Sequence, residues 1–247
     1  PGFVGDFNGA VTVSASTFAP LDLALPAANR TISGKLKDSS SAAGIPGVFI
    51  QAESASGQFV GAFSDSAGNY SVGVLADSWK LEPSSGSLAQ MGYLGWNTGT
   101  NVSTVSGNVG NFDLPVDQAT ALIYGTVKDN QNNPMIGVGI WSDEQSGQYD
   151  TAGTTFPTNA NYCLGVRAGS WWVGPDSRAL VALGYIGQGT NVTVTASQAV
   201  RVDFVLRQAN AHLIGQVVDN LGVPVGNIGF NASDHQNADN SVITDDN

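Results

Sequence analysis

The sequence predicts an all-β protein built from tandem antiparallel β-sandwich domains, and three observations lead to this prediction. A short motif with Asp between two apolar residues recurs at 21–25, 112–116 and 202–206. An apolar-Gly-apolar segment follows each motif at the same interval, in steps of 91 and 90 residues, with its glycines at Gly34, Gly125 and Gly215. Between these points, short alternating segments are separated by turns rich in Gly, Asn and Pro.

The first complete unit is expected to contain seven strands. Its segment 69–74 places Tyr70, Val72 and Val74 at alternate positions, so they share one face of a strand. No stretch of ten or more residues shows the 3.6-residue period of a helix. The expected strands lie near 31–37, 47–53, 58–64, 69–75, 78–83, 90–96 and 109–116.

The repeat spacing divides the 247 residues into four segments. The first holds the last strands of a preceding repeat and a linker, the middle two are complete sandwich repeats, and the fourth holds the first strands of a following repeat. In chain order the segments are 1–30, 31–121, 122–211 and 212–247. The connectors at 26–30 and 117–121 are short and lack Gly/Ser runs, so a semi-rigid, rod-like array is expected.

Two explanations stay open for the incomplete outer segments. Either the chain is part of a longer polypeptide with many repeats, or neighbouring copies complete these segments by strand pairing and join head to tail. A contact of the second kind does not close on itself and therefore grows into a filament. Both explanations predict a fibre.

The first unit carries a recognisable series of motifs. They are Gly-x-Leu-x-Asp at 34–38, Gly-Ile-Pro-Gly-Val at 44–48, Asp-x-x-Gly-x-Tyr at 65–70 and Trp-x-Leu at 79–81. The second unit lacks the Asp-x-x-Gly turn, and the third segment stops within it. The series resembles the carboxypeptidase regulatory-like family. This resemblance implies a transthyretin-like, Ig-like sandwich close to the collagen-adhesin B-type repeats, and a non-enzymatic module of stalks, adhesins and secreted enzymes.

Composition excludes several classes of function. The net charge is −11 and the nine Lys and Arg residues are scattered, so no nucleic-acid partner is expected. No apolar run approaches the roughly 20 residues that cross a bilayer, so no membrane span is expected. Cys163 is the single cysteine, and the sequence leaves open whether it crosslinks to another chain or lies buried at a contact.

No catalytic, cofactor or metal site is expected, and the chain is not expected to be an enzyme. The two histidines, His212 and His235, belong to no catalytic motif, and no Gly-x-Ser-x-Gly sequence is present. The segment 65–69 is rich in oxygen ligands but lacks the spacing and closing Glu of a calcium-binding EF-hand loop. A β-turn in which Asp65 accepts backbone hydrogen bonds is the simpler interpretation.

Five Asn-x-Ser/Thr sequences are candidate glycosylation sites if the chain is secreted. They are at Asn29, Asn69, Asn101, Asn191 and Asn231. Asn101 and Asn191 occupy the same position in the repeat, which shared ancestry of the repeats explains equally well.

The five tryptophans fall into two groups. Trp79 and Trp171 occupy equivalent inward positions and are expected in the cores. Trp96, Trp141 and Trp172 have no Trp counterpart in the other unit, and alternation turns Trp172 outward. These three are candidate contacts with a glycan, by stacking on sugar rings, or with a neighbouring domain or subunit that covers them.

These observations favour a structural segment or subunit of an extracellular or cell-surface stalk or filament. Its partners would be copies of itself or flanking repeats of the same chain. The alternative is a carbohydrate-binding or adhesive surface module, with glycans as partners.

Overall fold

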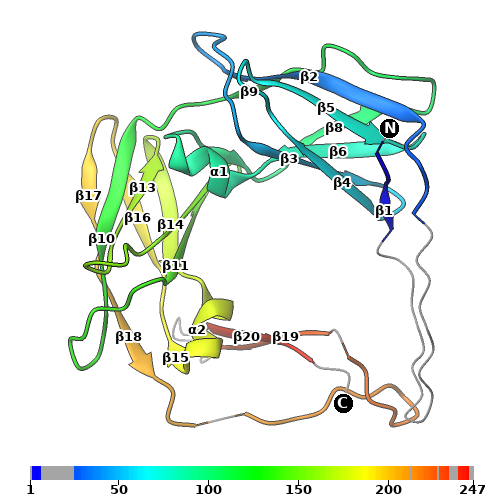
Figure 1. Ribbon diagram of the computed structural model, residues 1–247. Helices are drawn as coiled ribbons and strands as arrows, with labels where there is room; N and C mark the ends of the chain where they lie inside the picture. Colours follow the sequence, from blue (N-terminus) through cyan, green and yellow to red (C-terminus); the bar gives the residue numbers. More distant parts are fainter. Residues whose placement is uncertain (1, 7–24, 212, 227, 234–238, 245–247) are drawn as a thin grey trace. The chain divides into compact units, whose positions relative to one another are not determined.

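The computed structural model describes residues 2–6, 25–211, 213–226, 228–233 and 239–244. These residues form two compact units, unit 1 within 1–118 and unit 2 within 119–247. Strands make up most of the regular structure in both units (Figure 1), which confirms the predicted all-β fold.

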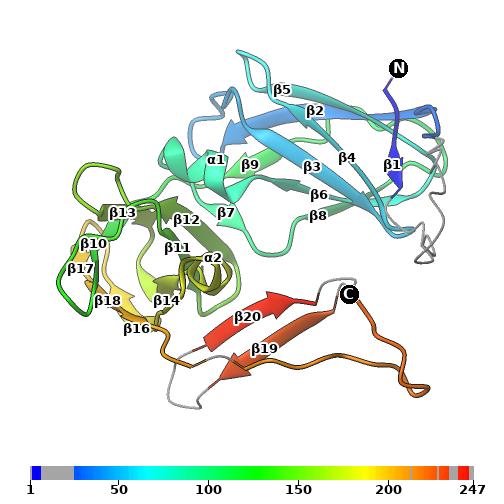
Figure 2. The same ribbon diagram turned by 60° about the horizontal axis from the view of Figure 1, so that its bottom comes forward.

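Unit 1 is a two-layer β-sandwich. Its elements are β1 (Gly5–Asp6), β2 (Arg30–Asp38), β3 (Phe49–Ser54), β4 (Gln58–Phe63), β5 (Asn69–Val74), β6 (Ser78–Pro83), α1 (Ser85–Gln90), β7 (Gly95–Trp96), β8 (Thr100–Ser103) and β9 (Leu114–Val116). One sheet has the order β1-β4-β3-β6-β8 and is antiparallel throughout; the other has the order β5-β2-β9. Figure 2 shows β2 and β5 on one side of unit 1, and β6 and β8 on the other.

Unit 2 repeats this plan. Its elements are β10 (Ala121–Asp129), β11 (Gly139–Glu144), β12 (Tyr149–Thr154), β13 (Asn161–Val166), β14 (Gly169–Pro175), α2 (Ser177–Leu183), β15 (Tyr185–Ile186), β16 (Thr190–Val194), β17 (Ala199–Arg201), β18 (Phe204–Gln208), β19 (Gly229–Ser233) and β20 (Asp239–Ile243). One sheet contains β16-β14-β11-β12 in this order. In the other, β10 pairs with β13 on one side and with β17 and β18 on the other, and β15 pairs with β18.

Parallel pairing between strands occurs in both otherwise antiparallel units, once in unit 1 and twice in unit 2, where β10 pairs with both β17 and β18. The last strand β9 runs parallel to the first strand β2, and β18 runs parallel to β10. Adjacent parallel strands need a long crossover between them, and here nearly the whole unit serves as that crossover.

The cores form where apolar side chains alternate along the strands. Along β10, every second residue from Ala121 to Asp129 is buried. Trp79 and Trp171 lie almost completely buried at the predicted positions. Each indole N–H also donates to a backbone carbonyl, of Leu75 at 3.0 Å and of Arg167 at 2.9 Å, so no buried donor is left without a partner there.

The repeated glycine marks a close backbone contact between the first and last strands. A Cβ at Gly34 would lie 2.0 Å from the carbonyl oxygen of Phe112, and one at Gly125 would lie 1.7 Å from that of Val202. Only glycine fits under such an approach. The same carbonyls accept a hydrogen bond from a core tyrosine hydroxyl, which is Tyr162 at 2.7 Å in unit 2 and Tyr70 in unit 1.

The repeated Asp completes this junction. Asp113 accepts a hydrogen bond from the N–H of Lys35 at 3.0 Å, and its other oxygen lies 2.6 Å from the Lys37 ammonium. Asp203 accepts one from the N–H of Thr126 at 2.9 Å. The Asp side chain thus replaces a main-chain acceptor where the parallel ladder is interrupted.

The structure differs from the sequence prediction after the fifth expected strand. The segment predicted as a strand at 90–96 is divided between the end of helix α1 and the two-residue strand β7. Ser84 begins α1 by accepting the N–H of Ser87, and Asp176 begins α2 by accepting that of Arg178. The helices have six and seven residues, too few for a sequence period to be visible.

Strands also form in the two outer segments. β1 pairs with β4, and the neighbouring Val4 is completely buried in the core of unit 1, a contact that the sequence prediction did not anticipate. In the last segment, β19 pairs antiparallel with β20. Asp219 there accepts two backbone N–H groups, as Asp129 does at the same repeat position.

Replacing Trp171 by Ala is expected to lower the free energy of unfolding of unit 2 by about 3–5 kcal/mol, because it opens a large cavity in the core. Denaturant titration followed by circular dichroism measures the loss. Trp172→Ala is the matched control, since that neighbouring side chain points outward, and it should cost less than about 1 kcal/mol. Equal losses from the two substitutions would contradict the described core.

Acidification is expected to weaken the unit 1 junction. The hydrogen bond from Lys37 holds the pKa of Asp113 below its usual value. Its stabilising effect is therefore complete above about pH 4, the ordinary pKa of Asp, and is lost as the pH falls through the lowered value. Asp113→Asn should cost at most about 1 kcal/mol at pH 7, since the pair is partly exposed.

Denaturant titrations at pH 6 and pH 3 test this expectation. Both Asp113→Asn and Lys37→Met should show a smaller loss of stability on acidification than the unsubstituted chain. An unchanged pH dependence in both variants would refute the role of the pair.

Candidate functional site

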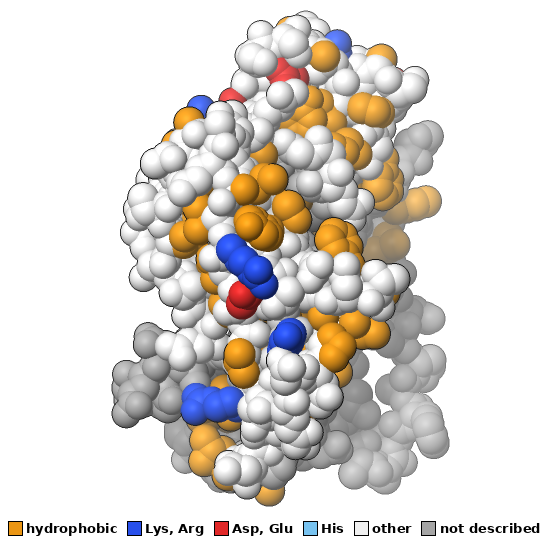
Figure 3. Space-filling model, turned by 90° about the vertical axis from the view of Figure 1, so that its left-hand side faces the viewer, with side chains coloured by type: hydrophobic (Ala, Val, Ile, Leu, Met, Phe, Trp, Pro, Cys, Tyr) orange, Lys and Arg blue, Asp and Glu red, His pale blue; other side chains and the backbone are white. Residues whose placement is uncertain are grey.

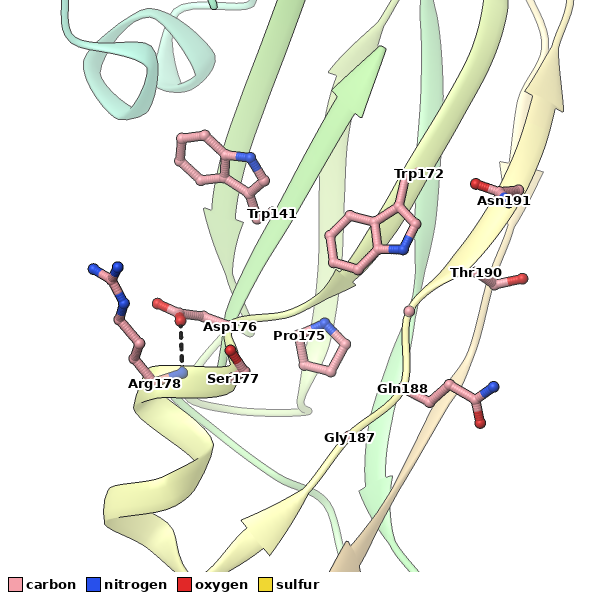
Figure 4. A pocket seen from close by; sticks show the side chains of 11 residues that line it. Trp141, Trp172, Pro175, Asp176, Ser177, Arg178, Gly187, Gln188, Thr190 and Asn191 are labelled. Carbon is pink, nitrogen blue, oxygen red and sulfur yellow. Dashed lines mark hydrogen bonds between the residues drawn. The ribbon is translucent and has the colours of Figure 1, made fainter. Parts of the chain in front are cut away.

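An open groove on the outer face of unit 2 is the candidate site (Figure 4). It has a volume of about 790 Å³ and lies across β11, β14, the start of α2 and the segment that leads into β16. The residues that carry its chemistry are Trp141, Trp172, Asp176, Arg178, Gln188 and Asn191.

Strand alternation turns Trp172 into this groove. On β14 the side chains of Trp171 and Val173 are buried, and Trp172 between them is 38% exposed. Its indole packs against two glycines: a Cβ at Gly174 would come within 2.7 Å of the ring, and one at Gly189 within 2.2 Å. The glycines therefore form a flat bed for the indole, and the rest of the ring remains open to solvent.

Trp141 lies on the neighbouring strand. In the β11–β14 ladder it is paired with Gly174, so it is a diagonal neighbour of Trp172 on the same face. Diagonal neighbours lie about 7–8 Å apart across a sheet, within reach of aromatic side chains. Trp141 is also 38% exposed, and both indoles line the same groove (Figure 4).

Polar side chains surround the two indoles. Asp176 and Arg178 lie at the first turn of α2, and one Asp176 oxygen accepts the N–H of Arg178 at 3.0 Å. Asn191 lies opposite Trp172 in the β14–β16 ladder, and its amide oxygen accepts a hydrogen bond from Gln145 at 3.0 Å. A carboxylate, a guanidinium and carboxamides thus line one aromatic groove (Figure 4).

Unit 1 carries different residues on the same face. Lys80 takes the position of Trp172, Glu82 that of Gly174 and Gln51 that of Trp141. The Lys80 ammonium lies 3.5 Å from the Glu82 carboxylate. A Cβ at Gly99, the counterpart of Gly189, would meet the Lys80 stem at 2.6 Å, so an aliphatic stem lies where unit 2 has an indole.

The structure brings together two of the three tryptophans singled out from the sequence. Trp141 and Trp172 line one groove, whereas Trp96 is partly buried and packs against the core of unit 1. The sequence analysis did not single out Asp176, Arg178 or the glycine bed. The Pro-Asp-Ser sequence before α2 is a helix-start signal that could have located the first two.

Four of the candidate glycosylation sites are exposed, and the side chain of Asn231 lies outside the described part of the chain. The exposed ones are Asn29, Asn69, Asn101 and Asn191. The amide of Asn69 donates to Asp65 at 3.2 Å, whereas Asn191 borders the groove. Glycosylation at these positions stays a prediction.

The segment 65–69 forms a tight turn. Asp65 accepts the N–H groups of Ala67 and Asn69 at 2.9 and 2.8 Å, which is the geometry expected of an Asp that stabilises its own turn. Within the described residues, no group of three or more His, Cys, Asp or Glu side chains could hold a metal ion. His212 and His235 lie outside these residues.

On the face shown in Figure 3, Lys and Arg side chains are few and scattered, one of them beside an acidic side chain, and hydrophobic side chains form separate patches. Neither helix in the described part of the chain is long and apolar enough to cross a bilayer.

Comparisons with known proteins gave weak structural likenesses alone. No protein-family model matches the chain, and no curated protein matches it, so the resemblance to the carboxypeptidase regulatory-like family stays a prediction. Among solved structures, the chain is similar to the TIE protein of Bacillus anthracis (11% identity, 72% of this chain and 34% of that one, TM-score 0.34).

Two pilins are similar to the same degree. They are the minor pilin GBS52 of Streptococcus agalactiae (12% identity, 76% of this chain and 100% of that one, TM-score 0.35) and the shaft pilin SpaA of Lactobacillus rhamnosus GG (10% identity, 74% and 99%, TM-score 0.30). At these values, the function has to be argued from the chain's own residues.

Cys163 is expected to react slowly with thiol reagents. Its side chain is exposed on β13, opposite Tyr124, and desolvation by the surrounding side chains raises the pKa of its thiol above the ordinary value. Less of the reactive thiolate is therefore present at pH 8 than in an unstructured chain. Alkylation by iodoacetamide, followed by intact mass, should be several-fold slower in the native chain than in urea. Equal rates would contradict this description of the site.

Proposed function

We propose that the chain is a non-enzymatic structural segment or subunit of an extracellular stalk or filament, built from tandem β-sandwich repeats. The repetition supports this proposal because the same contacts occur in both units at positions about 90 residues apart. In both units a tyrosine hydroxyl (Tyr70, Tyr162) and a tryptophan indole (Trp79, Trp171) each donate a hydrogen bond to a backbone carbonyl. In both units a hydroxyl, of Ser64 or Thr155, also accepts a backbone N–H, of Val48 or Val138.

The connector between the units carries the proposal. Four residues, 117–120, separate β9 from β10, and nearly all of them are attached to one unit or the other. Asp117 accepts a backbone N–H of unit 1 at 3.0 Å, and Gln118 donates to a unit 1 tyrosine at 3.3 Å. Thr120 donates to the carbonyl of Val166 in unit 2 at 2.8 Å. A connector that is short and lacks Gly/Ser runs supports the proposal of a semi-rigid array.

The segment from 213 to 244 supports the same proposal. Its Thr244 hydroxyl accepts the N–H of Ile228 at 2.9 Å, the counterpart of the Thr155 contact in unit 2. Several of its apolar side chains are strongly exposed, including Leu213 at 86% and Ile214 at 95%. Both observations support the proposal that this segment corresponds to the first strands of a repeat.

Small-angle X-ray scattering on the full chain tests the rod. A single globule of 247 residues would have a radius of gyration of about 18 Å. Two sandwiches in a row should give a clearly larger radius of gyration. This radius should not change with protein concentration as long as the chain is monomeric. Inserting Gly-Ser-Gly-Ser between Gln118 and Ala119 should broaden the distance distribution and leave the unfolding midpoints unchanged.

A value near 18 Å, or an insertion without effect on the scattering, would contradict the rod. Electron microscopy of the native material tests the assembly itself: fibres are expected, and compact single particles would refute the stalk or filament role.

A further inference from the structure

The groove in unit 2 is not used by the proposed structural role. The same face of unit 1 carries an ion pair, whereas unit 2 presents two indoles side by side, each 38% exposed. Adjacent exposed aromatic side chains with polar groups around them are typical of a binding site. We propose that this groove binds a saccharide, whose pyranose rings stack on Trp172 and Trp141. This inference is independent of the rod.

The bed under Trp172 explains why the indole can act as a stacking platform. Gly174 and Gly189 lie opposite each other where the β14–β16 pairing would continue, and the ring lies against both. Its orientation is therefore fixed before a ligand arrives, so little side-chain entropy is lost on binding. The exposed surface is a rigid aromatic plane with an indole N–H, which suits the apolar C–H face and the hydroxyls of a sugar.

The polar rim matches the hydroxyl groups of an uncharged saccharide. Asp176 accepts hydrogen bonds, Arg178 donates them, and the carboxamides of Gln188 and Asn191 do both. The single carboxylate and the single guanidinium balance each other within the groove. A net charge of −11 on the whole chain further disfavours strongly acidic polysaccharides.

The saccharide has two conceivable sources that share this chemistry. One is a free oligosaccharide or polysaccharide from the surroundings. The other is a glycan attached to Asn191, which begins an Asn-Val-Thr sequence and lies directly opposite Trp172 in the β14–β16 ladder. A glycan on Asn191 would begin beside the indole (Figure 4). The experiment has one arm for each source.

The first arm uses the full chain produced without glycosylation. Cellohexaose, chitohexaose, maltohexaose and mannohexaose are titrated by calorimetry and by tryptophan fluorescence. Binding of at least one hexasaccharide is expected, and Trp172→Ala and Trp141→Ala should each weaken it at least tenfold. Gly189→Ala should also weaken it with both indoles present, because the added Cβ displaces the ring.

Two controls make this arm specific. Lys80→Ala changes the counterpart of Trp172 in unit 1 and should leave binding unchanged. The Trp172→Ala variant should stay folded and lose less than about 1 kcal/mol of unfolding free energy, because the indole lies outside the core. Binding that survives both tryptophan substitutions overturns the proposal.

The second arm uses the chain isolated from its native source. Intact mass and peptide mapping should find a glycan on Asn191 if the occupant is attached. Its removal by a glycosidase should then increase acrylamide quenching of tryptophan fluorescence in the native chain.

Absence of both a glycan at Asn191 and binding of any of the four hexasaccharides overturns the proposal. It is also overturned if Trp172→Ala abolishes self-association of the chain without affecting saccharide binding, since the groove would then be a contact between copies.

Discussion

The close contact between the first and last strands holds each sandwich together. Gly34 lets the backbone at Phe112 pass over β2, the Tyr70 hydroxyl binds the carbonyl there, and Asp113 binds the next free N–H of β2. Each hydrogen bond contributes only about 0.5–1.5 kcal/mol. Their importance lies in position, because they join segments that are 42 and 78 residues apart in the chain and close both the sheet and the core beneath it. Unit 2 uses the same three side-chain types in the same arrangement.

The groove depends on this closed framework. Alternation along β14 places Trp171 in the core and Trp172 at the surface, so the buried indole fixes the strand that carries the exposed one. The two tryptophans are adjacent in sequence yet have opposite environments. A repeat can therefore change its outer face while its core contacts stay constant. Units 1 and 2 differ in this way, with Lys80 in unit 1 at the outer-face position that Trp172 occupies in unit 2.

Local patterns in the sequence were sufficient for the features that depend on alternation. They located the buried positions of Tyr70 and Trp79 and the outward direction of Trp172, because a two-residue period determines which face a side chain takes. They were insufficient where distant segments meet. The parallel pairing of β9 with β2 and the contact of Val4 with unit 1 join residues far apart in the chain, and the bed under Trp172 forms only where Gly189, just before β16, lies beside Gly174 on β14. The helix α1 was missed because six residues are too few to show a period.

The parallel arrangement of the outermost strands has a mechanical consequence. In unit 1 the chain enters β2 at Arg30 and leaves β9 at Val116, beside the far end of β2. Entry and exit are therefore separated by the length of a nine-residue strand, about 25 Å. Tension applied along the polypeptide would load the hydrogen bonds between these strands in shear, so they would have to rupture together instead of unzipping one at a time. A sandwich connected in this way is expected to resist stretching more strongly than one whose end strands separate one hydrogen bond at a time.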